Sequence, residues 1–186
     1  MKIVLGGSRN LAYMPEEVMS RLETYMAKNA EFLVGDAPGI DSKFQEILNR
    51  NQYRNVTVLS SAGHVRNNLG NWVTRIIDSG LKSKSAARHT AKDRVMTSEA
   101  EIGVMIWDKE SAGTLANVID LVNSGKSCLM YIAGDNELIE IDNQSTLEEL
   151  IAKYQEVGDE ARNRLNAYDR RNKKKIHLDL NKSLFD

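Results

Sequence analysis

Five short apolar runs recur along the chain, and segments with helical spacing separate them. The runs are residues 2–5, 31–34, 56–59, 102–107 and 128–133. Each is rich in Val, Ile, Leu or Phe, which is typical of a strand buried on both faces of a sheet. Strands that alternate with helices pair in parallel and place helices on both faces. The pattern therefore predicts an α/β fold, a Rossmann-like doubly wound parallel sheet of about five strands.

The remaining patterns predict the helices and the end of the chain. The expected helices cover residues 15–28, 40–51, 71–78, 92–100, 111–124, 146–156 and 159–172. Residues 80–90 have little periodicity and are expected to form a surface loop. Residues 176–180 alternate apolar and polar side chains, so they are interpreted as an edge strand or an arm onto a partner. A change of composition near residue 157 predicts a main domain over 1–157 and a charged C-terminal helix and tail over 158–186.

Composition and charge narrow the protein class. A chain of 186 residues can bury a core that needs no disulfide or metal. The single cysteine, Cys128, lies inside an apolar run and is expected to be a buried, inert thiol, which is compatible with a cytoplasmic protein. No signal peptide or membrane span is visible, so no membrane partner is expected. The net charge of −1 argues against a nucleic-acid partner, and the basic block 170–175 is interpreted as a solvated helix end in preference to a nucleic-acid contact.

Two glycine-bearing turns follow the first two strands and carry the most informative chemistry. They contain Gly6, Gly7, Ser8 and Arg9 in the first turn, and Gly35, Asp36 and Asp41 in the second. Each turn leads into a helical pattern, so backbone N–H groups at the helix start would face the carboxyl edge of the sheet. Open α/β sheets bind anionic and nucleotide ligands at this edge. Neither turn matches the dinucleotide or P-loop fingerprint, so the pattern predicts a nucleotide site without specifying its kind.

Three further segments place polar side chains near the same edge. They supply Arg66 and Asn67; Lys92, Asp93 and Arg94; and Asp108, Ser111, Gly113 and Thr114. Arg66 suits a phosphate clamp, whereas Trp72 is expected to fill the core rather than stack on a base. Thr114 suits either a helix N-cap or a phosphate ligand, and Asp108 suits a ribose ligand or a general base. The charged residues of the second segment either close over a ligand or form a solvated helix end. The expected ligand-binding set combines the two turns and the three segments. It consists of Gly6, Gly7, Ser8, Arg9, Gly35, Asp36, Asp41, Arg66, Asn67, Lys92, Arg94, Asp108, Ser111, Gly113 and Thr114.

Together these segments resemble the SLOG superfamily, which takes its name from the DNA-uptake protein DprA (Smf) and the cytokinin-activating LOG enzymes. The resemblance covers residues 1 to about 155 and is strongest to a small bacterial and phage branch. It rests on five motifs in order, at residues 6–9, 35–41, 66–68, 92–96 and 108–114. It implies a Rossmann-like, often dimeric protein that binds nucleotides or nucleotide-derived signals. We therefore expect a homodimer, which the apolar side chains of residues 159–186 also favour.

Comparison with the LOG motif separates binding from catalysis. LOG enzymes use a P-G-G-x-G-T-x-x-E stretch whose glutamate assists cleavage of the base–ribose bond. Asn117 stands at that position here, and an amide cannot act as a carboxylate base. We therefore expect a protein that binds a nucleotide or a nucleotide-derived small molecule in a sensing, sequestration or carrier role, with no cofactor or metal. The alternative is an N-glycosidase acting on a nucleoside 5′-monophosphate, with Asp36, Asp93 and Asp108 as catalytic candidates. A DNA-associated module is a third hypothesis, against which the net charge weighs.

Overall fold

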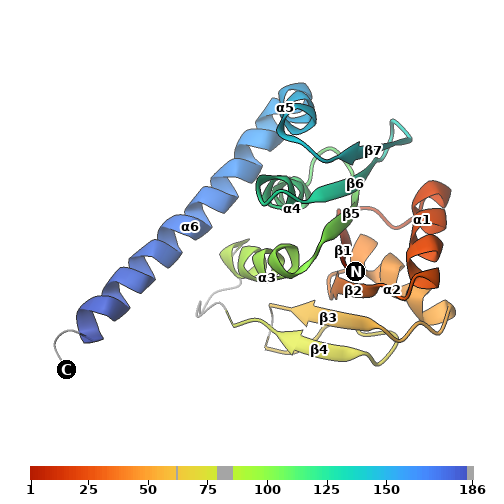
Figure 1. Ribbon diagram of the computed structural model, residues 1–186, viewed down its shortest axis with the longest axis horizontal. Helices are drawn as coiled ribbons and strands as arrows, with labels where there is room; N and C mark the ends of the chain where they lie inside the picture. Colours follow the sequence, from red (N-terminus) through yellow and green to blue (C-terminus); the bar gives the residue numbers. More distant parts are fainter. Residues whose placement is uncertain (62, 79–85, 184–186) are drawn as a thin grey trace.

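A seven-stranded sheet runs through the molecule, with helices on both of its faces (Figure 1). The computed structural model describes residues 1–61, 63–78 and 86–183. In chain order the elements are β1 (Lys2–Gly7), α1 (Glu16–Ala27), β2 (Glu31–Gly35), α2 (Ile40–Arg50), β3 (Val56–Ser60), β4 (Val73–Ile76), α3 (Ala86–Glu99), β5 (Ile102–Trp107), α4 (Ala112–Asn123), β6 (Ser127–Ile132), β7 (Glu137–Ile141), α5 (Gln144–Lys153) and α6 (Gln155–Ser183).

The strand order is β4-β3-β2-β1-β5-β6-β7, with β1 at the centre. All neighbouring strands pair in parallel except β6 and β7, which pair antiparallel. The five predicted strands all belong to the parallel part, so the Rossmann-like fold class is confirmed. The chain moves outward from β1 to β4 on one side and then returns to place β5 on the other side of β1. This reversal opens a crevice between β1 and β5, where sheets of this kind bind ligands.

Both faces of the sheet are buried, because successive side chains of each strand enter opposite cores. In β1, Ile3 and Leu5 pack with α1 and α2, whereas Val4 packs with α3, α4, α5 and α6. Cys128 belongs to the second of these cores, as predicted. Burial raises the pKa of its thiol, which keeps it uncharged and unreactive.

Two strands escape sequence prediction because both lie at edges of the sheet. The helix expected over 71–78 is wrong: this segment contains β4, whose Val73 and Ile76 side chains are exposed. β7, at the other edge, also has mainly exposed or half-buried side chains. Edge strands of this kind carry no continuous apolar signal, so the sheet has seven strands rather than about five. Trp72 fills the core as predicted, and its Nε1 donates to the Tyr53 carbonyl oxygen at 2.7 Å.

The C-terminal part of the chain differs from its predicted form. The strand expected at 176–180 is wrong, because α6 continues as a helix to Ser183 and extends away from the sheet (Figure 1). The division expected after residue 157 falls inside α6, whose Ala161 and Leu165 are buried against the main core. That division and the homodimer stay predictions. Of the loop expected over 80–90, residues 80–85 lie outside the described residues and the rest belong to α3. Within the described part of the chain, no helix combines the length and apolarity required to cross a lipid bilayer.

Candidate functional site

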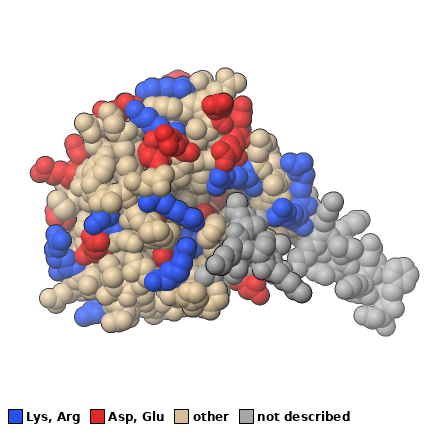
Figure 2. Space-filling view, turned by 180° about the vertical axis from the view of Figure 1, so that it is seen from behind, with Lys and Arg blue, Asp and Glu red and all other residues tan. Residues whose placement is uncertain are grey.

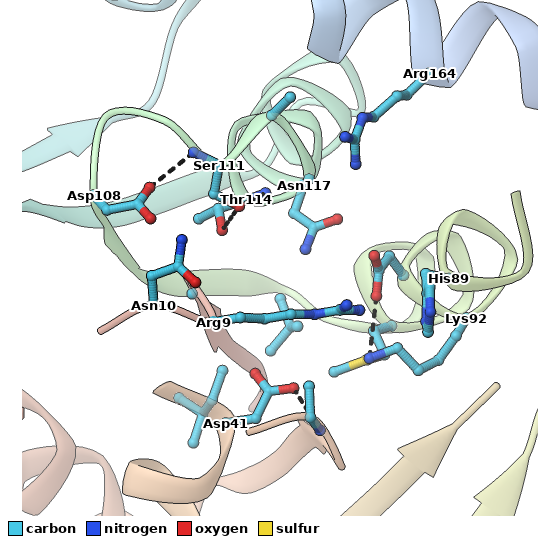
Figure 3. A pocket seen from close by; sticks show the side chains of 18 of the residues that line it. Arg9, Asn10, Asp41, His89, Lys92, Asp108, Ser111, Thr114, Asn117 and Arg164 are labelled. Carbon is cyan, nitrogen blue, oxygen red and sulfur yellow. Dashed lines mark hydrogen bonds and ion pairs between the residues drawn. The ribbon is translucent and has the colours of Figure 1, made fainter. Parts of the chain in front are cut away.

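A cavity of about 580 Å³ opens at the carboxyl edge of the sheet, at the reversal between β1 and β5 (Figure 3). Its polar lining comes from the turn after β1 (Arg9, Asn10), the start of α2 (Asp41), α3 (His89, Lys92, Asp93), the β5–α4 loop and α4 (Asp108, Glu110, Ser111, Thr114, Asn117) and α6 (Arg164). A volume of this size is typical of pockets for small molecules and cofactors. The predicted carboxyl edge therefore does form a pocket.

Ser8 connects the three turns that build the cavity. Its backbone N–H donates to the Ile106 carbonyl at 3.0 Å, and its carbonyl accepts from the Ile40 N–H at 3.3 Å. Its hydroxyl accepts from the Asp108 N–H at 3.0 Å. Gly39 allows the second turn to pack closely against the first, because a Cβ at this position would lie 2.4 Å from the Arg9 carbonyl oxygen. Its φ of +83° is also one that glycine adopts readily. Ser8 thus holds the site together, and the next residue, Arg9, projects into the cavity.

Arg9 is the exposed cation at the centre of the site. Figure 3 shows its side chain lying across the cavity, between Asp41 on one side and Thr114 and Asn117 on the other. Its guanidinium forms no hydrogen bond or ion pair with any residue that the structure describes. An exposed guanidinium without a protein partner retains its full capacity to bind an anion.

Asp41 and Lys92 form the buried polar floor of the cavity. Asp41 is 8% exposed and Lys92 is 6% exposed, yet both line the pocket. They lie over Gly35: a Cβ at this glycine would be 2.1 Å from Asp41 Oδ2 and 2.7 Å from Lys92 Nζ. Burial raises the pKa of Asp41 to about 6, and the nearby ammonium of Lys92 limits this rise. Burial by itself would lower the pKa of Lys92, but Asp93 and Asp41 outweigh it, so the pKa is raised.

The wall formed by α3 also carries a histidine. Lys92 Nζ pairs with Asp93 Oδ1 at 3.2 Å, and His89 Nδ1 lies 2.9 Å from the Ser61 hydroxyl oxygen. Burial, together with the charge of Arg9, lowers the pKa of His89 and favours the neutral imidazole. This wall therefore presents one buried cation, one carboxylate and one neutral ring.

The opposite wall is the start of α4. Asp108 Oδ1 accepts from the Glu110 and Ser111 N–H groups at 3.0 and 2.8 Å, which closes the turn that leads into the helix. Ser111 is the N-cap, and its hydroxyl oxygen accepts from the Thr114 N–H at 3.3 Å, so the N-cap role considered for Thr114 belongs to Ser111. Arg164 Nη1 lies 3.4 Å from the position of a Cβ at Gly113. A guanidinium from α6 thus lies beside the first turn of α4, while its Nη2 pairs with Glu160 at 2.6 Å.

The structure divides the expected ligand-binding set in two. Those that line the cavity are Gly7, Arg9, Asp41, Lys92, Asp108, Ser111, Gly113 and Thr114. Those that lie outside its lining are Gly6, Ser8, Gly35, Asp36, Arg66, Asn67 and Arg94. Of the three catalytic candidates, Asp93 and Asp108 line the cavity and Asp36 does not. Sequence position alone placed all of them at one edge, but it did not decide which side chains turn inward.

Asp36 and Arg66 form a pair that stabilises the loops beside the cavity. Asp36 is fully buried, and it accepts from Arg66 Nε at 3.0 Å, from Arg66 Nη2 at 2.5 Å and from the Ser60 hydroxyl at 2.7 Å. Burial alone would raise the pKa of Asp36, but these bonds outweigh it and hold the pKa at about 2. Asn67 Nδ2 donates to Ser42 Oγ at 2.8 Å. A ligand could reach Asp36 only if the ion pair between Asp36 and Arg66 opened.

Arg94 has a structural position of the same kind. It pairs with Asp120 of α4, and its Nη2 pairs with Asp169 of α6 at 2.6 Å. These contacts hold α3, α4 and α6 together behind the cavity.

Five polar pocket residues lie outside the sets predicted from the sequence: Asn10, His89, Glu110, Asn117 and Arg164. Asn10 follows the first glycine turn and could have been included with it. Arg164 had no local signal, because it lies in a charged helix that approaches α4 only in the folded chain. Among the described residues, no three His, Cys, Asp or Glu side chains are grouped as metal ligands.

Comparison with known proteins reveals a shared fold. No family model and no curated protein sequence matches the chain. A solved structure of DNA processing protein A from Helicobacter pylori matches with a TM-score of 0.54 and 17% sequence identity, over 90% of this chain and 81% of that one. The work on that protein concerns its single-stranded DNA binding mode. At this identity the likeness establishes a DprA-like Rossmann fold, and function has to be argued from the site.

This likeness corrects one expectation. Net charge argued against a nucleic-acid partner, but a protein with the same fold binds single-stranded DNA. Net charge sums over the whole chain and conceals local clusters. Here Arg9, Lys92 and Arg164 line one cavity, together with Asp41, Asp93, Asp108 and Glu110, in a chain whose net charge is −1.

Proposed function

We propose that the cavity binds a nucleotide or a nucleotide-derived small molecule, whose phosphate lies between Arg9 and the start of α4. The observation that carries this proposal is the Arg9 guanidinium, which has no partner among the described residues and whose side chain crosses the cavity beside Thr114 and Asn117 of α4 (Figure 3). Guanidinium groups bind phosphate through charge-assisted hydrogen bonds, and helix N-termini favour anions through their backbone N–H groups. Arg164, beside Gly113, adds a second guanidinium at the same end.

The two ends of the cavity differ in charge, which supports one orientation of the ligand. Arg9, Arg164 and the backbone N–H groups at the start of α4 favour an anion, although Asp108 and Glu110 line the cavity there too; at the other end Asp41 and Asp93 outnumber the single cation Lys92 and repel one. A nucleotide has this same asymmetry, since its phosphate is anionic and its sugar and base are uncharged. We expect the phosphate toward α4 and the uncharged part toward Asp41.

Isothermal titration calorimetry with a panel of nucleoside 5′-monophosphates, and with inorganic phosphate as a competitor, tests the proposal. We expect saturable binding that phosphate weakens. An absence of binding across the whole panel at millimolar concentration would refute it.

Membership of the SLOG superfamily belongs to this proposal. The order of the five motifs supports it, and so does the DprA-like fold, since DprA is one of the proteins from which the superfamily takes its name. The sensing, sequestration or carrier role inferred from the sequence requires binding without chemistry, which the amide of Asn117 favours.

The N-glycosidase alternative rests on Asp93 and Asp108, since both carboxylates line the cavity. Either could stabilise an oxocarbenium-like transition state. Chromatographic detection of free base after incubation with each monophosphate distinguishes this alternative from simple binding.

A second candidate ligand is single-stranded DNA, and the helix that supplies Arg164 favours it. The same helix, α6, carries the basic block 170–175. On the face shown in Figure 2, positive and negative side chains are interspersed, so attraction of a polyanion depends on such local clusters. Fluorescence anisotropy with a labelled oligonucleotide at several salt concentrations tests this candidate. Affinity that falls with added salt supports it, and no binding at low salt eliminates it.

A further inference from the structure

We propose that Asp41 and Lys92 recognise the 2′,3′-cis-diol of a ribonucleotide, so that the cavity selects ribonucleotides over 2′-deoxyribonucleotides. This inference rests on the proposed nucleotide-binding function and specifies which nucleotides the site accepts.

Both side chains are built into the cavity floor rather than displayed on its rim. Asp41 is 8% exposed and Lys92 is 6% exposed, and both line the cavity. Asp41 Oδ2 accepts a 3.3 Å hydrogen bond from the Ala37 N–H, while Oδ1 accepts none from the residues that the structure describes. Lys92 has three donors, of which Asp93 Oδ1 accepts one at 3.2 Å. One acceptor, Asp41 Oδ1, and two donors of Lys92 Nζ therefore remain available to a ligand at the buried floor of the cavity.

The two groups are also close enough for one small ligand group to contact both. A Cβ placed on Gly35 would lie 2.1 Å from Asp41 Oδ2 and 2.7 Å from Lys92 Nζ, so these two atoms approach the same position. Among the ion pairs of the described residues, however, Lys92 is joined to Asp93 and not to Asp41. A ligand that donates a hydrogen bond to a carboxylate and accepts one from an ammonium would satisfy the remaining hydrogen-bonding capacity of Asp41 and Lys92.

A vicinal diol meets this requirement because each hydroxyl both donates and accepts. Carboxylates bind ribose hydroxyls in the same way in dinucleotide sites. A phosphate fits this end less well, because the two carboxylates of Asp41 and Asp93 outnumber the single ammonium of Lys92. Figure 3 shows Arg9 lying between Asp41 and Thr114, so a phosphate held at α4 and a diol held at Asp41 would lie on opposite sides of the Arg9 side chain.

Loss of one hydroxyl would leave a buried polar group without its partner. A site built to hydrogen-bond a hydroxyl discriminates strongly against a ligand that lacks it, because desolvation of the unpaired group is not compensated. We expect each ribonucleotide that binds to do so at least about tenfold more tightly than its 2′-deoxy counterpart.

Calorimetric titration of the full chain with each 5′-ribonucleotide and its 2′-deoxy counterpart tests the inference without any variant. Asp41→Asn keeps the shape of the side chain and removes its charge, and we expect it to bring the ratio of the two affinities close to one. Glu46→Gln is the matched control: it lies on the same helix, pairs with Lys43 at the surface and should leave the ratio unchanged.

Each outcome has a distinct meaning. Equal affinities for ribo- and deoxyribonucleotides would overturn the inference and leave the proposed function intact. Absence of binding for every nucleotide would overturn the proposed function itself. An undiminished preference in folded Asp41→Asn would overturn the assignment to Asp41.

Discussion

Replacement of Asp36 by Asn tests whether the buried Asp36–Arg66 pair stabilises the fold. The pKa of Asp36 is held at about 2, against an ordinary value of 3.8, chiefly because the bonds from Arg66 and Ser60 outweigh burial. At 1.36 kcal/mol per pKa unit, the charged form contributes about 2.5 kcal/mol to the free energy of unfolding near neutral pH. Arg66 is 32% exposed, so water compensates part of its charge in the variant. We expect Asp36→Asn to lower the free energy of unfolding by about 2–3 kcal/mol at pH 7.

Urea denaturation followed by circular dichroism measures this change, and its pH dependence checks the cause. The pKa of Asp36 is lower in the folded chain than in the unfolded chain. Its contribution is therefore complete above about pH 5 and is lost as the pH falls from about 4 to 2. The difference between the two proteins should shrink over that range. Asp159→Asn, at an exposed position on α6, is the control and should change stability by less than about 0.5 kcal/mol.

Two results would refute this reasoning. A loss below about 0.5 kcal/mol at pH 7 would mean that the pair contributes little to stability. A loss that does not change with pH would mean that the charge of Asp36 is not its source. Nucleotide affinity adds a separate check, because Asp36 lies outside the cavity lining. A folded Asp36→Asn variant whose affinity falls more than about tenfold would return Asp36 to the ligand site.

Four further predictions follow from single positions. Arg9→Ala should weaken nucleotide binding by more than about 1.5 kcal/mol in calorimetry, and an unchanged affinity would remove Arg9 from the site. Gly39→Ala should lower the free energy of unfolding by about 1–3 kcal/mol, because its φ is +83° and Arg9 backbone atoms occupy the space of a Cβ; Gly63→Ala, with no atom within 4 Å, is its control. Cys128 should react with a thiol reagent only after unfolding in urea, and rapid reaction of the native protein would contradict its burial. Asp41→Asn should raise the free energy of unfolding above pH 7 by about 1–3 kcal/mol, since the raised pKa means that the folded state disfavours the Asp41 charge. This gain in stability should vanish as the pH falls from about 6 to 4. A gain that persists at pH 4 would contradict this cause.

The sequence by itself determined five of the six parallel strands and the edge at which the cavity lies. The five runs of β1, β2, β3, β5 and β6 are buried on both faces, so their apolar character is visible without knowledge of their neighbours. The glycine turns are equally local, because close backbone approach demands residues such as Gly39 at defined positions.

Tertiary structure alone decided which charged residues face the cavity. Arg9, Arg66 and Arg94 look alike in the sequence, yet Arg66 and Arg94 are held by Asp36 and Asp120, while Arg9 projects into the cavity with no partner among the residues that the structure describes. Residues distant in sequence form those pairs, so their partners depend on how the turns and helices pack. Packing also brought Arg164 to α4, and α6 continues as a helix through the apolar alternation of 176–180. Local periodicity determines elements and buried faces, whereas long-range electrostatic pairing exists only once the chain has folded.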